Sequence, residues 1–184
     1  TLFSAMIDDW RETWGYDFPF YYAQLAPFPT EGTLGVREAQ RKTLESTKNT
    51  GMAVLMDIGE EDDIHPHNKQ DVGKRLALLA LDKQYGFNYV SSGPKYKSHQ
   101  ANSRYLYVDF ESVGSGLDFI GGKNGFEIAG KDNKFYPATA KIINNRIRLY
   151  SKNVKRPINV RYGWKNWTVG TLFNKEGLPA SSFS

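Results

Sequence analysis

The N-terminal half of the chain alternates between helix-like and strand-like patterns of apolar residues. Residues 2–14 carry apolar side chains at spacings of three and four, which predicts an amphipathic helix that Gly15 ends. Residues 20–26 and 51–57 are continuous apolar runs, as expected of strands buried on both faces. The weakly amphipathic segment 33–47 between them predicts a surface helix. The order helix, strand, helix, strand is typical of a parallel sheet.

A polar turn at residues 59–67 separates the second predicted strand from a third helix. Asn68 is a suitable N-cap for this helix, with Asp71 three residues later, and Gly86 can form its left-handed C-terminal cap. The turn therefore follows the carboxyl end of a strand, which is where open parallel sheets bind their ligands.

The C-terminal half has a different texture, in which glycine and asparagine pairs separate short β-prone runs. Strands are expected at residues 105–110, 125–129, 138–143, 146–150 and 158–162. Asn144 and Asn145 fit a two-residue hairpin, because asparagine tolerates positive φ. We predict an antiparallel β-sandwich here, and hence two domains, residues 1–92 and 93–184.

Composition excludes several classes of function. The chain of 184 residues has a net charge of +4, and its 24 Lys and Arg are scattered among 20 Asp and Glu, so no nucleic-acid surface is expected. No apolar run approaches the length of a membrane-spanning helix, and no membrane contact is expected. The absence of cysteine excludes thiol catalysis and disulfides. No phosphate-binding loop or dinucleotide fingerprint is present.

The polar turn holds a candidate acid–base pair. A histidine that acts as a general base needs a carboxylate to fix its tautomer and orientation. Asp62 precedes His65 by three residues, a separation that lets the carboxylate fold back toward the ring, and Asp63 is a competing orienter. The competing interpretation is a solvated polar loop with no catalytic role.

Other side chains have alternative roles. His65 and His67 with neighbouring acids suggest a divalent metal site, but Pro66 hinders their convergence, and no metal is expected. His99 is interpreted as a surface residue rather than a ligand. Three aromatic residues form either a sugar-stacking platform or core packing, and packing is expected for at least two of them: Tyr162, Trp164 and Trp167.

A nucleophile is missing from the sequence. Ser4 lies inside the first predicted helix, Ser91 and Ser92 precede Gly-Pro, and Ser115 sits between glycines in a loop. None has the strand–turn–helix setting of an activated serine. Thr1 leads directly into the helical pattern, so we expect the chain to continue a longer protein that begins upstream.

A series of short motifs runs in order along nearly the whole chain. Up to the start of the polar turn they are residues 6–11, 18–27, 34–40, 49–54 and 57–59. From the turn onward they are residues 63–66, 68–70, 73–77, 92–94, 125–130, 160–164 and 177–180. Together they resemble the sialate O-acetylesterase family of SGNH-type hydrolases.

This resemblance implies an α/β fold, in which residues 1–92 are the C-terminal part of a flavodoxin-like, parallel-sheet SGNH hydrolase domain and the rest is a small accessory sandwich. It implies no cofactor. His65 maps onto the general base that takes the proton of a serine located before Thr1. Asp62 is the first choice for the orienting carboxylate and Asp63 the second, with a Ser–His dyad as a further possibility.

The sequence is therefore compatible with two functions. The first is a carbohydrate O-acetylesterase acting on an O-acetylated carbohydrate, to which this chain contributes the His/Asp turn. It needs the missing N-terminal segment as a partner, so the chain alone is expected to be inactive. The alternative is a non-catalytic carbohydrate-binding or structural β-module. The resemblance also implies a secreted or periplasmic location.

Overall fold

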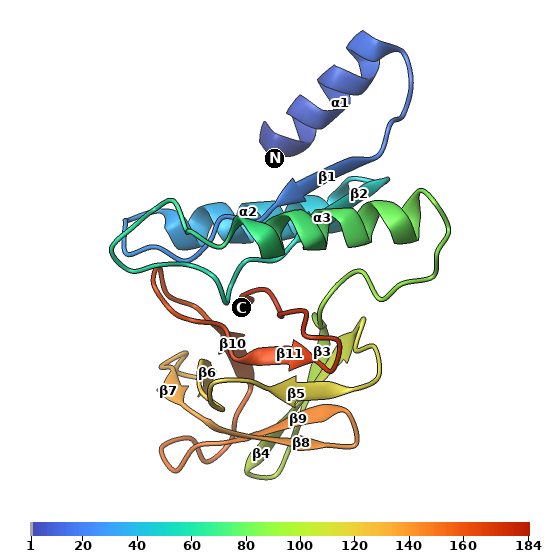
Figure 1. The fold of residues 1–184 in the computed structure, drawn as a ribbon. Coiled ribbons are helices and arrows are strands. Elements are labelled where there is room, and N and C mark those ends of the chain that lie inside the picture. Colours follow the sequence, from blue (N-terminus) through green and yellow to red (C-terminus); the bar gives the residue numbers. More distant parts are fainter. Residues whose placement is uncertain (1) are drawn as a thin grey trace.

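Two parallel strands with helices on both sides form the N-terminal half in the computed structural model, which describes residues 2–184 (Figure 1). Strand β1 (Phe20–Ala23) pairs in parallel with β2 (Thr50–Ala53). Helix α2 (Thr33–Ser46) connects them, α1 (Leu2–Trp14) precedes them, and α3 (Lys69–Lys83) follows. The predicted order of elements and the parallel pairing are confirmed.

Alternate side chains of the strand pair face different helices. Gly51 lies under Leu79 of α3, because a Cβ at that glycine would come within 3.0 Å of the leucine side chain. Gly51 pairs with Tyr21 of β1, and the next residue of that strand, Tyr22, faces the other way. Its hydroxyl donates to the backbone carbonyl of Gln40 in α2 at 2.8 Å. Successive strand residues point to opposite faces, so α2 and α3 cover opposite sides of the pair.

Burial at the outer edge differs from the sequence prediction. The first strand was expected to be buried on both faces, yet Tyr22 is the one buried residue among its four. In α1, Ile7 is fully buried while Trp10 and Trp14 of the predicted buried stripe are 42% and 61% exposed. The cause is that β1 pairs with β2 alone in the described part of the chain, so nothing there covers its outer side.

Helix α3 begins as predicted. The side-chain oxygen of Asn68 accepts the backbone N–H of Asp71 at 3.1 Å, which satisfies one of the free donors of the first turn. Its buried residues are Arg75 and Leu79, whereas Val72, Leu76 and Ala80 are half-buried.

The C-terminal half is built from antiparallel strands, as predicted. One sheet has four strands in the order β3 (Lys95–Asn102), β4 (Tyr105–Glu111), β9 (Arg146–Tyr150) and β8 (Thr139–Ile143). A second has the order β10 (Asn159–Tyr162), β6 (Phe126–Ala129) and β7 (Tyr136–Pro137), and β11 (Leu172–Asn174) pairs with β5 (Leu117–Phe119). Their inner side chains share one core that includes Leu106, Ile128 and Leu172. The division into two domains at residue 92 stays a prediction.

Local sequence explains which of these strands were predicted. Asn144 and Asn145 both have positive φ, 50° and 58°, as the predicted hairpin requires. Strand β3 was missed because it lies at the edge of its sheet and is largely polar, without an alternating apolar pattern. The strands β5, β7 and β11 are three residues or shorter, which is too short for a periodic signal.

Buried polar contacts fasten the two halves together. The guanidinium of Arg37 in α2, fully buried, donates to the backbone carbonyls of Lys165 and Asn166. The side-chain amide of Gln24, also fully buried, donates to the hydroxyl of Ser181 at 2.7 Å. The C-terminal half therefore forms a fixed support under the carboxyl ends of β1 and β2.

Candidate functional site

The predicted catalytic turn leaves the carboxyl end of β2 and leads into α3. Its first residues are held on three sides. The backbone N–H of Gly170 donates to the carbonyl of Met56 at 2.7 Å, which joins the turn to the C-terminal half. Gly59 is packed against the carbonyl of Pro27, where an added Cβ would come within 2.5 Å. The base of the turn is therefore rigidly placed between the two halves.

An ion pair fixes the same base to α3. The carboxylate of Asp57 accepts two hydrogen bonds from the guanidinium of Arg75, at 2.7 and 2.6 Å. Arg75 also donates to the carbonyl of Val54 at 2.7 Å. Both charged side chains are largely buried, and such two-point pairs fix orientation as well as position.

Beyond this base the turn extends into solvent. The side chain of His65 is 85% exposed. Its backbone N–H donates to the carboxylate of Asp63 at 2.7 Å, and its ring Nδ1 lies 3.6 Å from the same carboxylate oxygen. Asp62 is exposed and makes no hydrogen bond or ion pair within residues 2–184. The structure thus brings Asp63 to His65 and leaves Asp62 apart.

A second histidine of the turn has a different environment. The carboxylate of Glu60 accepts the backbone N–H of His67 at 2.6 Å and contacts its ring Nδ1 at 2.7 Å. These bonds raise the pKa of His67 above its ordinary value of 6.5, with the side-chain hydrogen bond to Glu60 as the main cause. They lower the pKa of Glu60, mainly through the backbone hydrogen bond from His67. This pair closes the turn across seven residues.

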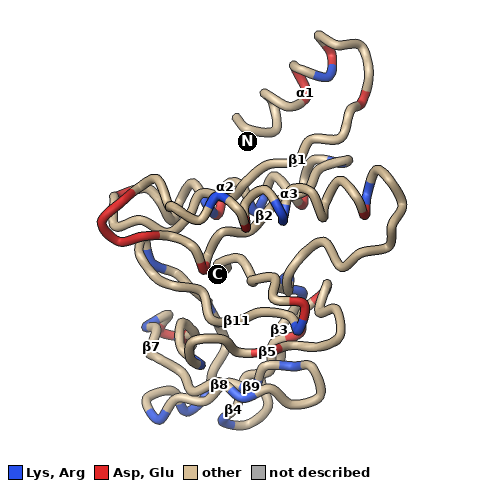
Figure 2. Tube along the Cα trace, in the orientation of Figure 1, with Lys and Arg blue, Asp and Glu red and all other residues tan. Residues whose placement is uncertain are grey.

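The turn is strongly acidic. Figure 2 shows a continuous acidic stretch at one end of the helical layer, formed by residues 60–63. His65 lies two residues after this stretch and carries an exposed imidazole, a group that can accept and return a proton. Within residues 2–184, no group of three or more His, Asp and Glu side chains is arranged to hold a metal ion.

Two of the serines considered from the sequence, Ser91 and Ser115, are engaged elsewhere. The hydroxyl of Ser91 donates to the carboxylate of Asp82 at 2.6 Å, and that of Ser115 donates to Glu176 at 2.5 Å. A hydroxyl bonded to a carboxylate lacks the imidazole that normally activates a serine nucleophile.

The remaining candidates, His99 and three aromatic residues, lie partly or fully inside the fold. His99 is half-buried: its Nε2 donates to the carbonyl of Ile158 at 2.8 Å, so its Nδ1 accepts the Tyr96 hydroxyl, also at 2.8 Å. Tyr162 is a core residue whose hydroxyl accepts the N–H groups of Thr171 and Leu172. Trp164 and Trp167 are both half-buried.

Sequence reasoning missed two residues that support the site. Arg37 and Gln24 hold α2 and the end of β1 on the C-terminal half, yet both read as ordinary polar residues of a surface helix and a strand end. Charged and amide side chains are rarely fully buried, so a single sequence gives no signal for such a role.

An aromatic surface lies beside the free edge of β1. The rings of Phe3, Trp10, Trp14, Phe18 and Phe20 contact one another in series, with centroids 5.8 to 6.4 Å apart. We call these five residues the aromatic edge. Exposed apolar patches of this kind mark surfaces that contact another polypeptide or a ligand. None of the helices in residues 2–184 is long and apolar enough to span a membrane.

Comparisons with known proteins relate the whole chain to carbohydrate esterases. It is 27% identical over 196 aligned residues to the sialate O-acetylesterase of Mus musculus, an alignment that covers 90% of this chain and 36% of that protein. The structure superimposes on the crystal structure of a carbohydrate acetylesterase from Xanthomonas citri with a TM-score of 0.90 and 41% identity, covering 98% of this chain and 44% of the other. No family model matches. The chain thus spans less than half the length of either relative.

Proposed function

Because the chain belongs to the sialate O-acetylesterase-like family, we propose that it contributes the acid–base turn of a carbohydrate O-acetylesterase, with His65 as the general base. One observation carries this proposal: an exposed imidazole stands on a firmly anchored turn at the carboxyl end of a parallel strand. That position is where parallel-sheet enzymes place their ligands.

The proposed reaction is an acetyl transfer through serine. A serine hydroxyl attacks the acetyl carbonyl carbon while His65 takes its proton, and the tetrahedral intermediate then expels the sugar oxygen. His65 returns the proton to that oxygen, which leaves a free sugar hydroxyl and an acetyl-serine. Water, deprotonated by the same imidazole, then attacks the acetyl-serine and releases acetate and the serine.

Asp63 is the orienting carboxylate that the geometry supports. Its oxygen already bonds the backbone of His65 and lies 3.6 Å from the ring nitrogen, so a small side-chain rotation completes a hydrogen bond. This reverses the order of preference reached from the sequence, in which Asp62 came first. Asp62 remains the alternative orienter, and the Ser–His dyad a third arrangement.

The serine belongs, in this proposal, to a segment that precedes Thr1 and adds strands to the free edge of β1. Two features support this: β1 pairs on one side alone within the described chain, and the aromatic edge includes Phe20 of this strand and the exposed Trp10 and Trp14. With such strands the sheet becomes the flavodoxin-like sheet of an SGNH hydrolase, and residues 93–184 become its accessory domain. A secreted or periplasmic location belongs to the same proposal.

The test is acetate release by a polypeptide that joins the segment before Thr1 to this chain. Acetylated sialic acid and acetylated xylan are assayed separately, because the turn does not choose between them. We expect release of acetate by the joined polypeptide and none by residues 1–184 alone. Full activity of residues 1–184 alone would contradict the proposal, since it would place the nucleophile in this chain.

The C-terminal half offers one observation in favour of carbohydrate binding as a second function. A cavity of about 250 Å³ is bounded by the indole of Trp164, with Asn124 and Glu127 among its polar walls. Aromatic rings beside amide and carboxylate groups are suited to a sugar ring. Binding of residues 1–184 to a glycan array, lost in Trp164→Ala and kept in Trp167→Ala, would support this function, and absence of binding would exclude it.

A further inference from the structure

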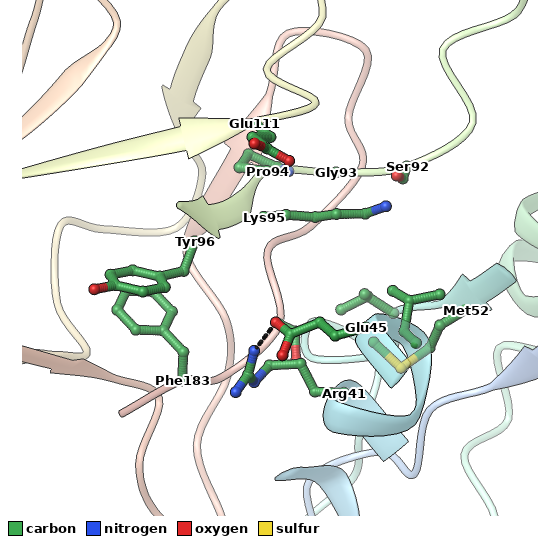
Figure 3. Close-up of a pocket in the computed structure, with 13 residues that line it drawn as sticks. Arg41, Glu45, Met52, Ser92, Gly93, Pro94, Lys95, Tyr96, Glu111 and Phe183 are labelled. Atoms are coloured by element: carbon green, nitrogen blue, oxygen red, sulfur yellow. Dashed lines mark hydrogen bonds and ion pairs between the residues drawn. The ribbon is translucent and has the colours of Figure 1, made fainter. Parts of the chain in front are cut away.

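A second cavity lies where the two halves of the chain meet, away from the His65 turn (Figure 3). Its walls come from α2 and the end of β2, from residues 92–96, from Glu111 of β4, and from residues 181 and 183, and none comes from residues 57–67. Its volume is about 240 Å³, or about eight water molecules. The space suits a small organic molecule.

Most charges in its walls are already neutralised. Arg41 donates two hydrogen bonds to Glu38, at 2.8 and 2.9 Å, and is also paired with Glu45. Glu111 is within 3.6 Å of the ammonium of Lys97, which points to solvent. These groups therefore contribute little net charge to the cavity.

Lys95 is the exception among the charged wall residues. Its side chain crosses the cavity with the ammonium at the end away from Tyr96 (Figure 3). The ammonium has no hydrogen bond or ion pair to any residue from 2 to 184. Its pKa is lowered, first by burial and then by Lys83, with Glu111 as a partial offset. A half-buried cation of this kind gains from an anionic ligand that replaces lost water.

The opposite end of the cavity is aromatic. The rings of Tyr96 and Phe183 are stacked, with centroids 4.7 Å apart and planes inclined by 29°. Met52 adds apolar surface on the side away from this pair (Figure 3), and Val54 also lines the cavity. A ligand that satisfies both ends therefore carries an anionic group on one side and a flat or apolar ring on the other.

We propose that this cavity binds a small ring compound with one carboxylate, whose carboxylate pairs with Lys95 and whose ring packs against Tyr96 and Phe183. The ligand contacts both halves of the chain, so its binding also stabilises their attachment. This site is separate from the proposed esterase turn and does not depend on it.

The experiment titrates residues 1–184 with four probes and follows backbone amide shifts by NMR. Benzoate and glucuronate carry the carboxylate on an aromatic ring and a sugar ring, and benzamide and glucose are their neutral counterparts. We expect at least one carboxylate to shift the amides of residues 92, 93, 95 and 96, and its neutral counterpart to bind roughly tenfold to a hundredfold more weakly. Which carboxylate binds identifies the ring.

Two variants assign the binding to Lys95. Lys95→Met keeps the apolar stem and removes the charge, and we expect it to weaken the carboxylate by the same factor. Lys131→Met removes an exposed lysine outside the walls of the cavity, and it serves as the control that leaves affinity unchanged. Failure of both carboxylates to bind, equal binding of a neutral counterpart, or an unchanged affinity in folded Lys95→Met overturns the proposal. The probe comparison on the unaltered chain decides it if that variant does not fold.

Discussion

Asp57 and Arg75 face each other across the start of the His65 turn and share two hydrogen bonds, at 2.7 and 2.6 Å. The guanidinium also holds the carbonyl of Val54, the residue that follows β2. One side chain of α3 thereby fixes both the end of the strand and the start of the turn. The position of His65 depends on this pair, although neither residue contacts the imidazole.

Asp57→Asn tests this dependence. The substitution keeps the size of the side chain but leaves Arg75 largely buried without a counter-charge, and breaking such a pair costs about 3 kcal/mol in the free energy of unfolding. We expect that loss in urea denaturation, with faster hydrogen exchange in residues 58–67. The exposed pair of Lys97 and Glu111 provides the control, because Glu111→Gln changes stability by less than about 1 kcal/mol. Equal effects of the two substitutions would refute the anchoring role.

Arg37→Leu tests the attachment of the two halves. The leucine leaves the part-buried carbonyls of Lys165 and Asn166 without their donor, so we expect the free energy of unfolding to fall by about 2 kcal/mol. Urea denaturation measures this, with the exposed Lys42→Ala as a control that stays within about 0.5 kcal/mol. A variant as stable as the unaltered chain would show that other contacts carry the interface.

The sequence predicted much of the architecture because its apolar periods are strong where the elements are buried. Helix α2 was expected at residues 33–47 and is found at Thr33–Ser46, and the Asn144–Asn145 hairpin has the positive φ that its residues favour. The predictions were wrong where burial depends on partners distant in the sequence. The exposed face of α1 and the polar edge strand β3 are such cases.

The candidate site was predictable in its location but not in its geometry. A polar turn between an apolar strand and a capped helix already pointed to His65. Periodicity carries no information on which aspartate lies nearer to the ring, because that depends on the conformation of an exposed loop. The buried supports Gln24 and Arg37 were equally invisible, since their burial results from contacts with residues more than a hundred positions away.

His67 provides a pH-dependent test of the turn. Its raised pKa means that the bond to Glu60 stabilises the turn fully below pH 6.5 and that this contribution is lost as pH rises through the raised value. The lowered pKa of Glu60 sets the acid limit, where the contribution is lost as pH falls through that lowered value. NMR titration should show His67 titrating above 6.5, and Glu60→Gln should return it toward 6.5. A His67 pKa that Glu60→Gln does not change would show that the pair does not form in solution.

Asp62→Asn and Asp63→Asn identify the orienting carboxylate. Asparagine at residue 63 still accepts the backbone N–H of His65, so the turn is kept while the charge is lost. We expect kcat of the joined polypeptide to fall by about a hundredfold to ten-thousandfold in Asp63→Asn and to change little in Asp62→Asn. The opposite order would assign the role to Asp62, and small effects in both would favour a Ser–His dyad.

The most direct test of the account is His65→Ala in the joined polypeptide, with His67→Ala as the control from the same turn. We predict that acetate release from an O-acetylated sugar falls by about a thousandfold or more in kcat for His65→Ala, as expected on removing a general base, while His67→Ala retains most of its activity. Undiminished acetate release by His65→Ala would contradict the assignment of this turn as the acid–base element.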